Sequence, residues 1–467
     1  MQITAFRGMT MGVCIPKVCS STQALDFVQN MVPFMNVTYN EYYCRLPGDK
    51  PWTAAEYVAM YTCFSDPKEA NPLLRSFSVY TNTQRFLTFK PQPGALECMD
   101  GIRAISMLWV VIGHTFFLSL IQASSIISPT HILLQWMTTL SSIWVITAPI
   151  TVDTFFLLSG ILIYISCFLS TARFIQSLPL FYLNRLLRMF PLLAVVILLQ
   201  AGILHQVADG PFWSNVALST QHCRKYWWST LLHVQNYVNP DQLCLGQTWY
   251  LSVDVQLYLV SPIVLVWMFG SSTMTCIILA LAMALSLVGS SLYSYLFDFS
   301  AALMFEDYMQ TYYVNTLARA PPFVIGMAYG YLLHLWRDKK VRIPKFYVIT
   351  LWLMSFLLMA FCFFSIYPVM QPDHTAQAFD NFLNAYMRAI WGLALGWLVV
   401  ACVHGYGGPI NWFLSLSLWK LPARLSYAVY LVHFPIMMTV NGTWVKPHYF
   451  STGDSVSINS LLYGSRG

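Results

Sequence analysis

Charged residues are scarce in this chain of 467 residues. Asp, Glu, Lys and Arg together make up 9% of it, whereas hydrophobic residues make up 57%. Soluble domains carry about 25% charged residues, so this chain has too little charge to cover a water-exposed surface of its size. The scarcity excludes a soluble enzyme, a disordered protein and a coiled coil. The composition predicts an all-α protein that crosses a membrane several times.

Several catalytic motifs are also missing. The sequence has no Gly-x-Ser-x-Gly, no His-Glu-x-x-His, no Walker A loop and no Gly-x-Gly-x-x-Gly. Serine hydrolases, zinc proteases, ATPases and dinucleotide enzymes depend on these motifs, so these classes are excluded. We therefore expect no metal and no bound cofactor. The net charge of +6 comes from basic residues in short loops, which does not suggest a nucleic-acid partner.

The apolar residues form nine continuous runs, each close to the ~20 residues that cross a bilayer as a helix. The predicted spans lie near residues 101–122, 143–169, 189–207, 249–269, 274–293, 319–336, 346–369, 382–404 and 421–440.

Basic residues predict the orientation of the spans, because Lys and Arg favour cytoplasmic loops. They concentrate in the predicted loops before the third span, after the sixth and before the ninth, whereas residues 123–142 contain none. If the spans alternate, the first one starts in the cytoplasm at Arg103.

Two cysteines, Cys223 and Cys244, fall in the predicted loop between the third and fourth spans. This loop is non-cytoplasmic, where a disulfide is permitted. We predict that they form one; two unpaired thiols are the alternative.

Four segments are expected along the chain. Residues 1–52 contain three cysteines and a sequon at Asn36, as a partial extracellular cysteine-rich module would. Residues 53–97 form a linker in which an expected span is weak or missing. Residues 98–440 form the membrane domain, and residues 441–467 a tail with a sequon at Asn441. We expect an incomplete chain that lacks a leader and one span, with a truncated tail. The alternative places residues 1–52 in the cytoplasm with free thiols.

Ionisable residues within spans are functional candidates, because they are costly to bury there. Arg103 and His114 share the first span. Their spacing of eleven residues is about three helical turns, so they lie on one face, ~16 Å apart along the axis. An arginine can bind phosphate and a buried histidine can accept a proton. The alternative is an interfacial arginine and a histidine bonded to the backbone.

Other polar residues within or beside spans are more ambiguous. Asp153 either orients a histidine or makes a helix–helix contact, and Asp254 is either functional or interfacial. Arg185 and Arg188 lie on one helix face and either join Arg103 around an anion or anchor the membrane surface. His433 is either a second functional imidazole or a packing residue.

Five short stretches resemble, in order, sequence blocks of the acyltransferase 3 family. The first is the spacing Arg-x10-His, which Arg103 and His114 have. The others are residues 155–160 (FFLLSG), the pair Arg185 and Arg188, residues 249–256 and residues 426–433. Residues 12–20 also resemble the end of the extracellular module of the family's nose-resistant-to-fluoxetine subgroup. The family core usually has ten spans, of which this chain shows about nine.

The resemblance implies an integral-membrane O-acyltransferase that moves an acyl group from acyl-coenzyme A to a hydroxyl acceptor. The phosphates of this donor would bind from the cytosol to Arg103, Arg185 and Arg188. The membrane would be the plasma membrane or the endoplasmic reticulum, and membrane lipids would be further partners.

The same resemblance gives His114 the role of general base or transient acyl carrier. Asp153 or Asp254 would orient it or balance its charge. Three residues of the matching blocks are secondary candidates for the site: Trp249, Tyr430 and His433. A non-catalytic lipid or xenobiotic transporter is the main alternative function, and a structural receptor or scaffold is a third.

Overall fold

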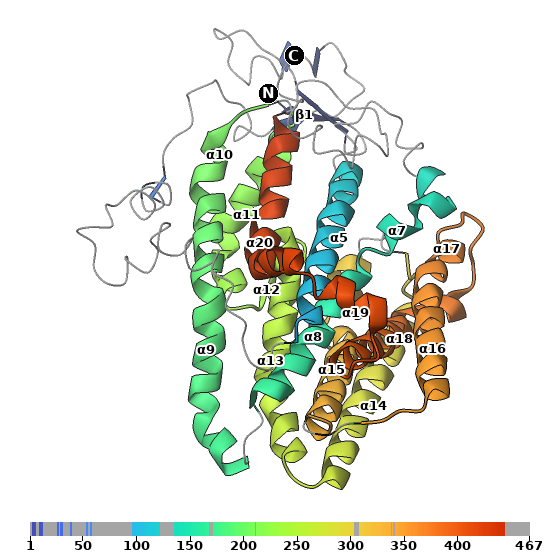
Figure 1. Ribbon diagram of the computed structural model, residues 1–467. Helices are drawn as coiled ribbons and strands as arrows, with labels where there is room; N and C mark the ends of the chain where they lie inside the picture. The colour runs from blue at the N-terminus through green and yellow to red at the C-terminus, as the bar shows by residue number, and fades with distance from the viewer. Residues whose placement is uncertain are drawn as a thin grey trace.

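A computed structural model gives the fold of the protein (Figure 1). It describes residues 96–121, 135–167, 171–210, 212–302, 308–337, 339 and 341–443, and short stretches between residues 2 and 57. From residue 96 onward, every regular element in the described ranges is a helix. The prediction of an all-α membrane domain is therefore confirmed.

The described part of the membrane domain contains ten long helices. They are α5 (Cys98–Ile121), α8 (Ile150–Cys167), α9 (Thr171–Leu198), α11 (Ser214–Leu231), α13 (Trp249–Met268), α14 (Ser272–Phe297), α15 (Thr316–Leu335), α16 (Lys345–Phe364), α18 (Gln377–Val403) and α20 (Lys420–Gly442).

Short helical segments join or extend these helices. Five are α-helical: α7 (Ile143–Ile146), α10 (Leu204–Val207), α12 (Gln235–Val238), α17 (Ile366–Val369) and α19 (Gly408–Leu414). The 3-10 segments are η3 (Leu140–Ser142), η5 (Gly246–Thr248) and η7 (Ser417–Trp419). The π-helical segments are η4 (Leu199–Ile203) and η6 (Tyr308–Tyr313).

The N-terminal segment contains a small sheet that the all-α prediction did not include. Strands β1 (Gln2–Ala5), β2 (Met9–Gly12) and β3 (Thr38–Tyr39) pair antiparallel in the order β2-β1-β3. Pairing between strands satisfies the backbone hydrogen bonds of such short segments. A strand of four residues or fewer is too short for its sequence pattern to predict it. The cysteines of the predicted module and Asn36 lie outside the described residues.

Each of the nine predicted spans coincides with a helix, but the third begins much earlier than predicted. Helix α9 starts at Thr171, so Arg185 and Arg188 lie within the helix and not in a loop before it. The prediction followed the apolar run alone. The first half of α9 mixes apolar and polar side chains, and helices of this kind form when one face packs against neighbours.

Seven helical stretches in the described part of the chain are long and apolar enough to cross a membrane. They include α5, α8, α9, α13, α14, α16 and α18, whereas α15 and α20 fall below that apolarity. The protein is therefore an integral membrane protein with several spans. In Figure 1, α9 lies at one edge of the bundle and α16 at the other, with α5, α8 and α13 between them.

Helices α8 and α15 meet at two glycines. A Cβ atom on Gly160 would collide with the carbonyl oxygen of Phe323, and one on Gly326 with that of Leu157. The absence of side chains allows the two backbones to touch, as small residues do in membrane helix pairs. This contact sets the position of Asp153, two turns earlier on α8, and of Arg319, two turns earlier on α15.

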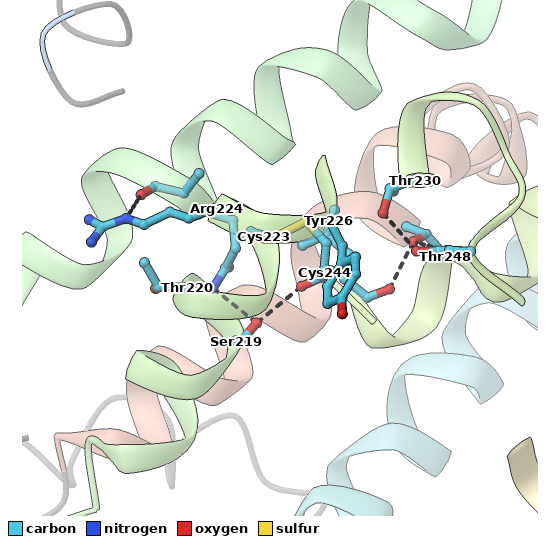
Figure 2. Close-up of a disulfide and its surroundings, with 12 residues drawn as sticks. Ser219, Thr220, Cys223, Arg224, Tyr226, Thr230, Cys244 and Thr248 are labelled. Atoms are coloured by element: carbon cyan, nitrogen blue, oxygen red, sulfur yellow. Dashed lines mark hydrogen bonds between the residues drawn. A yellow bond between two sulfur atoms is a disulfide. The ribbon is translucent and has the colours of Figure 1, made fainter. Parts of the chain in front are cut away.

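The predicted disulfide between Cys223 and Cys244 is present (Figure 2). It joins α11 to the segment that leads into α13. Hydrogen bonds reinforce the junction: the Ser219 hydroxyl donates to the Cys244 carbonyl over 3.1 Å. The side-chain amide of Gln235 donates to the Thr248 hydroxyl over 2.8 Å. The disulfide thereby fixes the chain around residues 246–249, which forms one wall of the site described below.

Candidate active site

An apolar cavity of about 550 Å³ lies between α5, α7, α8, α20 and the start of α13. Its volume is within the range of small-molecule sites. Most of its wall is aliphatic or aromatic. The predicted site residues in the wall are His114, Trp249 and Tyr430.

The two predicted histidines form a pair at this wall. Nδ1 of His114 lies 2.8 Å from Nε2 of His433, although 319 residues separate them. Nδ1 of His433 lies 3.0 Å from the carbonyl oxygen of Val429, one turn earlier on α20. Phe434 packs edge-on against the His114 ring, with centroids 5.4 Å apart.

These contacts determine the tautomers of a neutral pair. A carbonyl oxygen only accepts hydrogen bonds, so Nδ1 of His433 carries its proton and Nε2 is an acceptor. Nδ1 of His114 must then donate to that acceptor. The lone pair of His114 is left on Nε2, where a base requires it.

Next to this pair, Gln247 connects the cavity wall to α20. Its side-chain amide donates to the Leu431 backbone carbonyl over 2.9 Å, and its backbone carbonyl accepts from the Tyr430 hydroxyl. Its side-chain oxygen is buried without a hydrogen-bond partner. A buried acceptor of this kind is costly unless a ligand donates to it. Gln247 was not predicted, because a glutamine outside a span carries no signal in the sequence.

The three predicted arginines gather near one another. Arg103 lies within electrostatic range of Arg188 and Tyr250, and Tyr250 is also within range of Arg185. Arg103 lies 3.9 Å from Asp100, and Arg188 is exposed without a carboxylate partner in the described part of the chain. That the three guanidinium groups bind one anion stays a prediction.

The structure does not place either predicted carboxylate on His114. Asp254 forms an ion pair with Arg185 in the described structure. Asp254 thus contacts Arg185 and not His114, and the site roles predicted for these two residues stay predictions. A buried carboxylate is stabilised more by a guanidinium than by a neutral imidazole, which explains the partner.

Asp153 is held by a different arginine, Arg319. Nη1 of Arg319 lies 3.1 and 3.0 Å from the two carboxylate oxygens. Nε of Arg388 lies 3.9 Å from Oδ2 of the same carboxylate. In this structure His433, and not Asp153, contacts His114, whereas Asp153 joins α8 to α15 and α18.

Arg319 and Arg388 are the charged residues that sequence analysis missed. Each lies within or at the start of a predicted span, so the rule that singled out Arg103 applies equally to them. Arg319 is 1% exposed and Arg388 is 3% exposed. Arg319 also stacks on Tyr313 and faces Trp249, both of which line the cavity.

Asn441, the second predicted glycosylation residue, lies in the last turn of α20 and is partly buried. Its modification stays a prediction.

Comparisons with known proteins show which proteins this chain is similar to. The nose resistant to fluoxetine protein 6 of Caenorhabditis elegans is 28% identical over 412 residues, which cover 81% of this chain and 49% of that protein. A candidate O-acetyltransferase of Staphylococcus aureus (strain COL) is 22% identical over 362 residues, covering 74% of this chain and 51% of that protein. The chain thus spans about half the length of these curated relatives. No solved structure matches.

The family comparison covers the whole membrane domain. The model of the acyltransferase domain of the acyltransferase 3 family matches residues 96–463. This range contains the cavity, the histidine pair and the arginine cluster. The chain therefore belongs to the acyltransferase 3 family of membrane acyltransferases.

Proposed function

We propose that this protein is an O-acyltransferase that moves an acyl group from acyl-coenzyme A to a hydroxyl acceptor inside the membrane. The hydrogen-bonded pair of His114 and His433 at the wall of an apolar cavity supports this proposal most strongly. The name of the Staphylococcus aureus relative is consistent with transfer to oxygen.

In the proposed reaction, Nε2 of His114 removes the proton of the acceptor hydroxyl. The hydroxyl oxygen attacks the thioester carbonyl, and the tetrahedral intermediate collapses with release of the coenzyme A thiolate, which takes up the proton. His433 accepts a hydrogen bond from Nδ1 of His114 and so stabilises the positive charge that develops on the ring. In the alternative route, the same Nε2 carries the acyl group transiently.

Arg103 and Arg188 are proposed to bind the phosphates of the donor. Arg103, on α5, and Arg188, on α9, place positive charge near the end of α5 at which that helix begins. A guanidinium binds phosphate through two parallel hydrogen bonds. The ~16 Å between Arg103 and His114 along α5 is a distance that the extended pantetheine arm can span. Arg185, held by Asp254, would position this cluster.

The proposed topology has nine spans, with α15 and α20 crossing the membrane alongside the seven more apolar helical stretches. Support comes from packing: α15 contacts α8, α14 and α18, and α20 contacts α5. The arginine cluster would face the cytosol, where acyl-coenzyme A is available. The segments 1–52, 53–97, 98–440 and 441–467 remain the proposed organisation, in the plasma membrane or the endoplasmic reticulum.

The function is tested by transfer of label from radioactive acetyl- and palmitoyl-coenzyme A in membranes that contain the protein. Wild type is compared with His114→Ala and with the matched control His404→Ala, which changes a histidine packed edge-on against Trp336 away from the cavity. Base-labile label on a lipid or sugar is expected with wild type and with the control. Equal labelling in His114→Ala would contradict the role of His114.

A non-catalytic transporter of lipids or xenobiotics is the second candidate, because the cavity wall is mostly apolar and presents few polar groups. A transporter would retain uptake when His114 is replaced by alanine. Measuring uptake and label transfer with the same variant separates the two functions.

A further inference from the structure

Two arginines and one aspartate form a buried charge cluster behind the cavity. Arg319, Arg388 and Asp153 are 1%, 3% and 1% exposed. Two guanidinium groups against one carboxylate leave an excess of one positive charge among the described residues. An uncompensated buried charge costs several kcal/mol, so this arrangement favours a bound anion.

Nitrogen atoms of both guanidinium groups lack hydrogen-bond partners. Nη2 of Arg319 and Nε of Arg388 are buried, and neither donates a hydrogen bond. The 3.9 Å between Nε of Arg388 and the Asp153 carboxylate is too long for a hydrogen bond. The other groups of Arg388 are used: Nη1 donates to the Asn384 carbonyl over 2.7 Å and Nη2 to the Tyr308 hydroxyl over 3.0 Å.

A small second cavity, of about 30 Å³, adjoins this cluster. Asp153, Arg319 and Arg388 line it, together with Tyr308 and Tyr313. This volume is sufficient for a water molecule or a monatomic ion. Tyr313 lines both this cavity and the large one.

We propose that Arg319 and Arg388 bind one chloride-sized anion in this small cavity. A water molecule would fill the same space and accept the same hydrogen bonds, but it would leave the excess charge in place. An anion accepts these hydrogen bonds and also balances the excess charge. A halide is the monatomic anion of this size. The site is separate from the histidine pair and does not depend on the proposed acyl transfer.

Thermal unfolding of the purified full chain tests the proposal at constant ionic strength, with sodium chloride replacing sodium gluconate. The melting temperature should rise with chloride and reach a plateau, as binding at one site requires. Bromide should have the same effect. Arg388→Gln leaves one guanidinium against one carboxylate and should abolish the rise. The matched control Arg337→Gln, at an exposed position, should retain it.

Two results would overturn the proposal: a wild-type melting temperature that does not change with chloride, or a rise that persists in Arg388→Gln. Glu306 and Asp307 lie outside the described residues and provide a further test. If only the Glu306→Gln, Asp307→Asn variant responds to chloride, these carboxylates neutralise the cluster and the proposal is wrong. Should Arg388→Gln fail to fold, binding of ³⁶Cl⁻ to wild type decides, with one displaceable ion per chain expected and none contradicting it.

Discussion

Replacing Asp153 with asparagine removes the carboxylate that Arg319 and Arg388 share. Coulomb attraction at 3.0 Å is about 5 kcal/mol for an effective dielectric constant of 20. Breaking a buried ion pair on one side costs about 3–5 kcal/mol. Because the asparagine variant leaves two buried guanidinium groups without a carboxylate, we expect a loss of unfolding free energy of about 5 kcal/mol.

The two arginine variants should be less destabilised, in a defined order. In Arg319→Gln, the Asp153 carboxylate keeps Arg388, 3.9 Å away, as a partner that can move closer. We expect a loss of about 3 kcal/mol there, at the low end of the range. Arg388→Gln keeps the pair of Asp153 and Arg319 and relieves the excess charge. Its bonds to Tyr308 and Asn384 are lost, together with its longer contacts to Asp153 and the Tyr312 ring, so we expect about 1–2 kcal/mol.

Titration of the purified chain with SDS in chloride-free mixed micelles measures these free energies. Reaction of the buried cysteines Cys98, Cys362 and Cys402 with a thiol dye reports unfolding. An Asp153→Asn variant that is less destabilised than Arg388→Gln, or that lies within about 1 kcal/mol of wild type, would refute the shared role of this carboxylate.

Three further predictions concern the disulfide, a buried histidine outside the cavity and the histidine pair. The double variant Cys223→Ser, Cys244→Ser should lose up to about 3 kcal/mol of unfolding free energy, because the disulfide closes a loop with a sequence separation of 21. An unchanged midpoint in the SDS titration would contradict this prediction. Burial lowers the pKa of His233 to about 4. The unfolded state therefore takes up the proton first, so stability should fall between pH 6.5 and 4, and His233→Gln should flatten that part of the profile. His433→Gln can still accept from Nδ1 of His114, whereas His433→Phe cannot; transfer rates should fall further in the phenylalanine variant, with an altered pH profile.

The helices follow from the sequence because apolar runs long enough to cross a bilayer have few other structures available. Helix α9 shows the limit: its first half carries Arg185 and Arg188 and forms through packing, which the run of apolar residues does not reveal. Arg319 and Arg388 were visible as charges within predicted spans. The partner that each of them binds was not, since that depends on how α8, α15 and α18 pack.

The same distinction applies to the site. Arg103 and His114 could be predicted because both lie on one helix, at a spacing that helical geometry converts into a shared face. The contact between His114 and His433 joins α5 to α20 across 319 residues, and no local pattern specifies it. The resemblance implies a carboxylate beside His114, but the two predicted carboxylates, Asp153 and Asp254, each face a guanidinium that stabilises them more.

The central claim is that His114 is the base of a membrane acyltransferase. It is tested most directly by a single-turnover measurement on the purified full chain in lipid nanodiscs, with labelled acetyl-coenzyme A and a membrane extract as the source of acceptor. Wild type, His114→Ala and His404→Ala are compared at matched melting temperatures. A rate that falls at least about 100-fold in His114→Ala alone is the expected result. Equal rates in all three proteins, or no transfer by the well-folded wild type, would contradict the claim.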